Sequence, residues 1–246
     1  MGKDKLRRFA ENLTFERLVQ PAFEEIFRND HALKGHWHEH FFRNDNPIVL
    51  ELGCGKGEYT VALAERNPER NYIGVDIKGA RMWRGAKTAT EKEMPNVGFV
   101  RTRIEFINSF FAEGEVDEIW ITFPDPQLKK TNKRLTSTRF LSYYRRFMGP
   151  DGIINLKTDS PFLYEYTRRL AVENGLEILD STDDLYSREE DCIEKEIKTF
   201  YEQQWLSRGK TIKLLKFRIG SNELKEPDVS DLEPDDYRAA ARFNRT

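Results

Sequence analysis

Short apolar segments alternate with segments of helical periodicity through most of the chain. Five apolar runs have the length of buried strands and lie at 47–53, 71–77, 96–103, 116–123 and 152–159. Helical spacing follows most of these runs, and the last helix opens with Ser160 and Pro161, a typical helix start. Strands that alternate with helices predict parallel βαβ units, with helices covering both faces of one sheet.

Two further apolar runs, LEILDST and TIKLLKFRI, have no long helix between them and predict an antiparallel pair. The sequence therefore predicts an α/β fold of three layers, with a mostly parallel seven-stranded sheet and an antiparallel edge strand. We expect residues 1–46 to form an N-terminal extension that is helical in part around 14–28. Residues 47–219 form the folded domain, and residues 220–246 form an acidic, flexible tail.

Charge is unevenly distributed, although the net charge is only −2. Residues 127–150 contain seven lysines and arginines and no acidic residue, which favours a polyanionic partner such as a nucleic acid. The two cysteines form neither a metal motif nor a disulfide framework, so a cytoplasmic location is expected. No apolar run of the sequence approaches the roughly 18 residues that a membrane span requires.

All four histidines lie in the segment HALKGHWHEH, at residues 31–40. This segment is open to two interpretations: a metal site, or a solvated stretch of aromatic and basic residues. No matching cluster of metal ligands is found elsewhere in the sequence. We therefore expect no metal.

Acidic residues stand at the ends of four predicted strands, where ligands of open α/β sheets bind. These residues are Glu51, Asp76, Asp125 and Asp159, and Arg103 ends the remaining strand. A structural cap is the alternative for any one of these acids. Four of them at one edge of a sheet indicate a ligand site.

The glycine-rich loop ELGCGKG places Gly53, Gly55 and Gly57 directly after Glu51. Glycines at these positions let the backbone turn tightly and lie against a ligand. The spacing differs from the dinucleotide fingerprint G-x-G-x-x-G, and Glu51 would repel a pyrophosphate. Glu51 could instead hold an ammonium group, and Asp76 could accept two ribose hydroxyls. Together they predict S-adenosylmethionine as the cofactor.

The stretch FPDPQLKK places Asp125 between Pro124 and Pro126, which restrict the backbone and remove two amide donors. Asp125 is therefore presented rigidly at a strand end, where it could orient a nucleophilic nitrogen. A turn with a capping aspartate is the alternative. The basic residues that follow on the loop have phosphate as their natural partner; they are Lys129, Lys130, Lys133 and Arg134.

Five motifs, ELGCGKG, YIGVDI, FPDPQLKKTNKRL, LKTD and TFYEQQWLSRG, occur in this order. Together they resemble the tRNA (guanine-N7)-methyltransferase family over roughly residues 35–219. The resemblance implies a Rossmann-like class I methyltransferase fold. It also implies methyl transfer from S-adenosylmethionine to N7 of a guanine in the tRNA variable loop, guanine 46 by tRNA convention.

The same resemblance implies roles for individual residues. Asp125 corresponds to the catalytic acid, and Glu51 and Asp76 correspond to the cofactor acids. Together with the glycine-rich loop and the strand ends, the predicted cofactor contacts are Glu51, Gly53, Gly55, Asp76, Arg103 and Asp125. The substrate contacts are Lys129, Asp159, Thr199 and Glu202. The RNA contacts are Lys130, Lys133 and Arg134.

The chain departs from the family pattern at three points. Gln127 stands where the family usually has tryptophan, the loop KKTNKRL is one residue shorter than expected, and Arg103 stands where an acid is frequent. Two alternatives are another class I RNA or protein methyltransferase, and a non-catalytic RNA-binding module on the same fold. The lysines and arginines of residues 127–150, which have no acidic residue among them, argue against a small substrate. The presence of Glu51, Asp76 and Asp125 argues against a non-catalytic module. The oligomeric state is left open.

Overall fold

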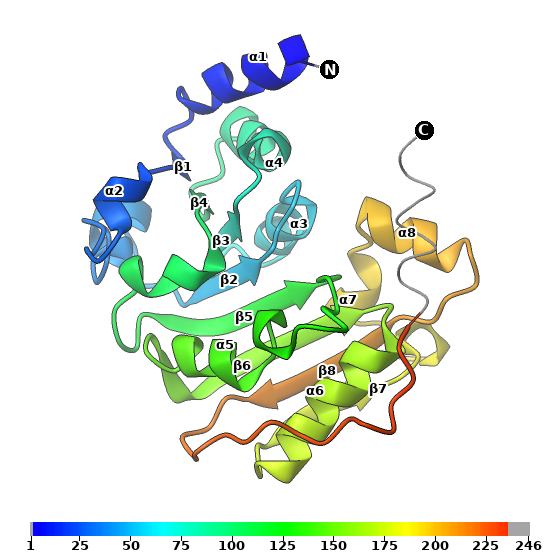
Figure 1. Ribbon diagram of the computed structural model, residues 1–246. Helices are drawn as coiled ribbons and strands as arrows, with labels where there is room; N and C mark the ends of the chain where they lie inside the picture. Colours follow the sequence, from blue (N-terminus) through cyan, green and yellow to red (C-terminus); the bar gives the residue numbers. More distant parts are fainter. Residues whose placement is uncertain (1, 236–246) are drawn as a thin grey trace.

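Eight strands form one sheet in the computed structural model, which describes residues 2–235 (Figure 1). The strands are β1 (Leu18–Val19), β2 (Ile48–Leu52), β3 (Asn71–Asp76), β4 (Val97–Arg101), β5 (Val116–Thr122), β6 (Met148–Thr158), β7 (Ile178–Thr182) and β8 (Lys213–Arg218). Their order across the sheet is β1-β4-β3-β2-β5-β6-β8-β7. β8 runs antiparallel to both of its neighbours, and the other neighbouring pairs are parallel.

Helices cover both faces of the sheet. The α-helices are α1 (Gly2–Asn12), α2 (Phe23–Ile26), α3 (Glu58–Arg66), α4 (Gly79–Glu91), α5 (Thr138–Tyr144), α6 (Pro161–Glu173), α7 (Ile193–Glu196) and α8 (Phe200–Leu206). The shorter turns are the π-helix η1 (Trp37–Phe42) and the 3-10 helices η2 (Ile104–Ser109), η3 (Thr131–Lys133) and η4 (Leu185–Ser187). Among the described residues, no helix combines the length and the apolarity needed to cross a membrane.

Each face of the sheet has its own hydrophobic core, and β2 contributes to both. Ile48, Leu50 and Leu52 pack into the core that also holds α5 and α6, whereas Val49 packs into the core that holds α3 and α4. Successive side chains of a strand point to opposite faces, so Glu51 shares the face of Val49. The side chain of Glu51 is therefore directed toward α3.

The predicted α/β fold with a mostly parallel sheet and a late antiparallel pair is confirmed. The sheet has one strand more than the seven predicted, because β1 pairs with β4 at the edge through Leu18 and Phe99. A strand of two residues is too short to produce an alternating pattern in the sequence. The N-terminal segment also differs from the prediction, since α1 ends at Asn12, before the predicted range, and α2 covers only four residues within it.

The acidic tail runs along α6 through residue 235 (Figure 1). Glu226 accepts hydrogen bonds from the backbone N–H of Thr138 at 3.0 Å and from the hydroxyl of Tyr166 at 2.5 Å. Asp231 forms a two-pronged ion pair with Arg169, at 2.6 and 2.8 Å. Residues 221–235 are thus held against the domain, contrary to the predicted flexible tail. Residues 236–246 lie outside the described residues.

Candidate active site

The order of the strands reverses between β2 and β5. From β2 the chain proceeds outward through β3 and β4, and β5 then lies on the opposite side of β2. Ligands of such sheets bind at this reversal, beyond the carboxyl ends of the strands. Glu51 and Thr122 stand near the carboxyl ends of β2 and β5, so the structure brings both to the expected ligand position.

Hydrogen bonding and packing fix the glycine-rich loop that follows β2. The backbone N–H of Gly53 donates to Val75 O at 2.8 Å. Gly53, Gly55 and Gly57 have φ angles of 78°, 57° and 70°, a region that residues with side chains rarely adopt. A Cβ atom on Gly57 would lie 2.5 Å from the ring of Phe99, whereas one on Gly53 would meet nothing within 4 Å. Gly57 therefore serves packing, and Gly53 leaves room for a ligand.

Asp76, at the end of β3, is fixed beside this loop. Its Oδ2 accepts from the backbone N–H of Gly55 at 2.9 Å, and its Oδ1 accepts from that of Lys78 at 2.7 Å. The carboxylate is half-buried, and each oxygen retains a lone pair for a further donor. Asp76 is therefore positioned to accept two hydroxyl groups of a ligand, as its predicted role requires.

Glu51 is only 4% exposed, and its hydrogen-bond donors are neutral. Oε1 accepts from the Thr122 hydroxyl at 2.7 Å, and Oε2 accepts from both the backbone N–H and the hydroxyl of Thr60. Burial raises the pKa of Glu51 to about 7, and the nearby charge of Asp76 adds to the increase. A buried carboxylate with neutral donors gains from an added positive charge, so the site suits an ammonium group.

We expect Glu51 to lower the stability of the folded chain as the pH rises from about 4.5 to about 7. The unfolded chain loses the Glu51 proton first, so stability present below pH 4.5 is lost as the pH passes the folded-state pKa. This loss amounts to about 3 kcal/mol. The Glu51→Gln variant has no carboxyl group to ionise at this position and should not show this loss of stability. Glu113→Gln, which replaces an exposed glutamate, should show the same loss as the unmodified chain. Urea unfolding at pH 4.5 and pH 8 measures the difference, and equal losses in all three chains would contradict this account.

Two adjoining clefts open along the carboxyl ends of the strands. Gly53 and Asp76 line both. The first cleft is also lined by Glu51, Gly55, Tyr59, Thr122, Thr199 and Tyr201. The second has a volume of about 440 Å³ and is also lined by Ile77, Arg103, Ile104, Gln127, Lys133, Leu135 and Phe140. An elongated ligand could therefore extend from the buried acid, past Asp76, to a partly apolar wall.

Contacts over the first cleft join α8 to the glycine-rich loop and to α4. Arg81 donates from Nη2 to the Tyr201 hydroxyl at 2.6 Å. Lys56 Nζ lies 4.6 Å from the centre of the Phe200 ring, and Glu58 accepts from the Phe200 backbone N–H at 3.2 Å. Sequence reasoning does not predict the contact between Arg81 and Tyr201. No local signal could do so, because the contact joins residues that are far apart in the chain.

The turn after β5 presents Asp125 to solvent. Phe123 and Gln127, on either side of it, have positive φ angles of 49° and 47°, which residues other than glycine rarely adopt. The Asp125 Oδ1 atom accepts from the Gln127 backbone N–H at 2.9 Å, and the side chain is exposed. The turn therefore fixes a carboxylate at the strand end, and backbone strain of this kind is common at functional sites.

Arg134 supports this turn, and its buried position does not favour the predicted contact with RNA. The side chain is buried, with 2% of its surface exposed. Its Nε donates to Pro126 O and its Nη2 donates to Leu128 O, both at 3.1 Å. The guanidinium also lies 4.8 Å and 4.4 Å from the ring centres of Phe162 and Tyr166. Arg134 thus holds the backbone of the turn against α6.

Three lysines of the same loop are exposed, as contact with RNA requires. Lys129 and Lys130 precede the η3 turn, and Lys133 ends it beside the second cleft. Arg103 is also exposed and lines the second cleft. Their contacts with RNA, substrate or cofactor remain predictions.

Of the predicted substrate contacts, Thr199 lines a cleft, whereas Asp159 is buried at the end of β6. Thr199 caps α8 by accepting from the Glu202 backbone N–H at 3.2 Å, and it lines the first cleft. Asp159 is 2% exposed, and its Oδ2 accepts from Lys210 Nζ at 3.1 Å. Burial raises the pKa of Asp159, and its Oδ1 has no hydrogen-bond partner among the described residues. Because the side chain is buried, a substrate N–H could reach that oxygen only after a change of conformation, and the contact stays a prediction.

Glu202 was also predicted to contact substrate, but the structure gives it another position. The side chain is fully buried, and its Oε1 lies 2.7 Å from Lys157 Nζ, which is fully buried as well. The Tyr186 hydroxyl donates to the same oxygen at 2.7 Å. Glu202 therefore ties α8 to β6, and this buried position does not favour its predicted contact with substrate.

The strand order and the clefts at the strand ends define a Rossmann-like methyltransferase fold. The 16S rRNA methyltransferase KamB shares it with a TM-score of 0.59, at 17% identity, over 74% of this chain and 92% of that one. A 30S ribosomal A1408 methyltransferase from an uncultured bacterium gives a TM-score of 0.51, at 16% identity, over 72% of this chain and 89% of that one. Identities this low show the fold alone.

Sequence similarity identifies the family more narrowly. Residues 45–215 match a protein-family model described as "Putative methyltransferase". The tRNA (guanine-N(7)-)-methyltransferase of Porphyromonas gingivalis is 55% identical over 95% of this chain and 97% of the relative. That of Bacteroides fragilis is 51% identical over 100% of this chain and 98% of the relative. The chain belongs to the tRNA (guanine-N(7)-)-methyltransferase family.

Proposed function

We propose that this chain transfers a methyl group from S-adenosylmethionine to N7 of a guanine in tRNA, with guanine 46 of the variable loop as the target. The observation that carries the proposal is the 55% identity, over nearly full length, to a tRNA (guanine-N(7)-)-methyltransferase. The exposed lysines after β5 support a nucleic-acid substrate. We place the enzyme in the cytoplasm, in keeping with this substrate and with its two free cysteines.

The strand ends fit S-adenosylmethionine. Glu51 offers a buried carboxylate with neutral donors to the ammonium group, and Gly53 leaves space for the chain of the methionyl moiety. Asp76 would accept the ribose hydroxyls. The apolar wall of the second cleft, which includes Ile104 and Phe140, suits the adenine ring. Arg103, beside it, contributes through its backbone.

In the proposed reaction, the chain orients two reactants, S-adenosylmethionine and a guanine. S-adenosylmethionine, when bound, supplies an electrophilic methyl group. Guanine N7 carries an in-plane lone pair, so no proton has to be removed before attack. The methylated ring becomes cationic, and Asp125 and Asp159, at the ends of the neighbouring strands β5 and β6, would stabilise that charge. The two carboxylates would also accept from the N1–H and 2-amino groups of the guanine.

Transfer of labelled methyl to unmodified tRNA tests the proposal. The chain is incubated with tRNA and methyl-labelled S-adenosylmethionine, and the nucleosides are then separated. Label in 7-methylguanosine is the expected result, and label in another nucleoside would overturn the proposed substrate. A tRNA transcript with adenine in place of guanine 46 should accept no label, and label in that transcript would move the target to another guanine.

The salt dependence of tRNA binding should identify the loop that contacts phosphate. We expect Lys130→Ala combined with Lys133→Ala to weaken binding, because both side chains are exposed and uncompensated. The slope of log K against log salt should fall by about 0.7–0.9 for each lost phosphate contact. Lys225→Ala, beside Asn174 at the carboxyl end of α6, serves as the control and should leave the slope unchanged. An unchanged slope in the double variant would remove the loop from the RNA interface.

A further inference from the structure

We propose that His36, Glu39 and His40 form a binding site for a divalent transition-metal ion of the Zn²⁺ class. His36 directly precedes η1, and the other two residues lie within it. The segment adjoins the amino-terminal end of β2, since the His38 ring lies 3.1 Å from Asn46 O. The site is thus on the edge of the sheet opposite the candidate active site, and the proposal does not depend on the proposed function.

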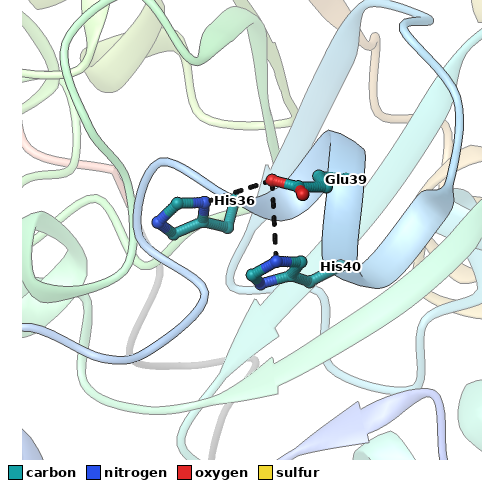
Figure 2. A group of neighbouring side chains, drawn as sticks. All are labelled: His36, Glu39 and His40. Atoms are coloured by element: carbon teal, nitrogen blue, oxygen red, sulfur yellow. Dashed lines mark ion pairs between the residues drawn. The ribbon is translucent and has the colours of Figure 1, made fainter.

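The geometry of the three side chains is close to that of a metal site. Figure 2 shows the Glu39 carboxylate facing both imidazole rings. Its Oε2 lies 3.6 Å from His36 Nδ1 and 3.5 Å from His40 Nε2, and ligand atoms of all three residues lie within 4.8 Å of one another. Zn²⁺ binds nitrogen and oxygen at about 2.0–2.2 Å in tetrahedral geometry, which places neighbouring ligand atoms roughly 3.4 Å apart. Both carboxylate–imidazole separations already approach that value.

The backbone beneath the site is firmly held. Trp37 is fully buried, and its Nε1 donates to Phe110 O at 2.7 Å. The Trp37 backbone N–H donates to Glu115 at 3.1 Å. The π-helical turn places the rings of His36 and His40 in a stack, with centres 4.8 Å apart and planes 14° apart. Ligands on a fixed backbone lose little freedom on binding, and π-helical turns are frequent at functional sites.

The ligand set selects the class of ion. Two imidazoles with one carboxylate suit Zn²⁺, Co²⁺, Ni²⁺ and Cu²⁺, whereas Mg²⁺ and Ca²⁺ prefer a shell of oxygen ligands. Three protein ligands leave a fourth position for water. Because the site lies away from the carboxyl ends of the strands, the bound ion would fasten the segment before β2 and take no part in methyl transfer. Sequence reasoning set this site aside because it sought ligands outside the histidine segment, whereas the third ligand lies inside it.

Calorimetric titration with Zn²⁺ tests the proposal on the full chain, prepared without a polyhistidine tag. We expect one ion per chain. His36→Gln and His40→Gln should each weaken binding at least tenfold, and Glu39→Gln should weaken it as well. His38→Gln is the matched control, because this histidine belongs to the same segment but its ring nitrogen contacts Asn46 O. It should bind Zn²⁺ as the unmodified chain does.

Thermal unfolding supplies a second readout. At a free Zn²⁺ concentration about one hundred times the Kd, the ratio of folded to unfolded chain should rise about one hundred-fold, and Mg²⁺ should have no effect. Zn²⁺ binding that survives both His36→Gln and His40→Gln would overturn the proposal and assign the ion to other groups, with the half-buried thiol of Cys192 the first to examine. Failure of the unmodified chain to bind Zn²⁺ would overturn it directly.

Discussion

Asp125→Ala should reduce methyl transfer to tRNA by about 100- to 1,000-fold, the range measured when one group that stabilises developing charge is removed. The carboxylate is exposed at the end of β5, and its position is fixed by the turn between Phe123 and Gln127. The change removes no buried contact, so the chain should stay folded and keep its affinity for tRNA. Single-turnover methylation and a tRNA binding isotherm measure the two effects separately.

Asp125→Asn separates the charge of this side chain from its part in the turn. The asparagine oxygen can still accept the hydrogen bond from the Gln127 backbone N–H, but it carries no negative charge. We expect the asparagine variant to be nearly as inactive as the alanine variant, since charge is the property that the reaction uses. Glu113→Ala, which removes an exposed acid just before β5, should leave the rate unchanged. Normal activity in Asp125→Ala would refute the assignment of the catalytic centre.

The sequence predicts the arrangement of these acids because parallel strands share an edge. Glu51 and Asp76 are 25 positions apart in the chain, yet β2 and β3 are neighbours, so both line the first cleft. Local patterns reveal the strand ends, and the α/β topology places all of them at one side of the sheet. The strand-end acids therefore follow from apolar periodicity and a general rule of topology.

Burial of charged side chains could not be predicted in the same way. Arg134 stands among exposed lysines in the sequence, and its burial depends on Phe162 and Tyr166 of α6, a helix that follows later in the chain. Glu202 is buried opposite Lys157 of β6 and accepts from the Tyr186 hydroxyl, and neither partner is near it in the sequence. A sequence pattern predicts the same exposure for every lysine and arginine of a loop. Long-range packing decides which of them is structural.

Glu202→Ala should lower the free energy of unfolding by about 3–5 kcal/mol, because it leaves the buried Lys157 ammonium without its ion-pair partner. Lys157 Nζ lies 2.7 Å from Glu202 Oε1, and both side chains are fully buried. The ammonium also donates to the carbonyl oxygens of Glu194 and Ile197. These contacts hold α7 and α8 against β6. Urea unfolding measures the loss of stability.

The same substitution should weaken the binding of S-adenosylmethionine. Thr199 and Tyr201 line the first cleft from the start of α8, and Glu202 anchors that turn of the helix. Gln203→Ala, an exposed substitution in the same helix, should change stability by no more than about 0.5 kcal/mol and should leave cofactor affinity unchanged. Calorimetric titration with S-adenosylmethionine compares the two variants.

A double variant distinguishes anchoring from substrate contact. Lys157→Met combined with Glu202→Leu replaces the buried ion pair by apolar side chains, and such exchanges often restore stability. If Glu202 anchors α8, the double variant should recover most of the stability and cofactor affinity that Glu202→Ala loses. The coupling energy of the two sites then follows from the double-mutant cycle. If Glu202 instead contacts substrate, Glu202→Ala should slow methylation without loss of stability, and the apolar pair should restore no activity.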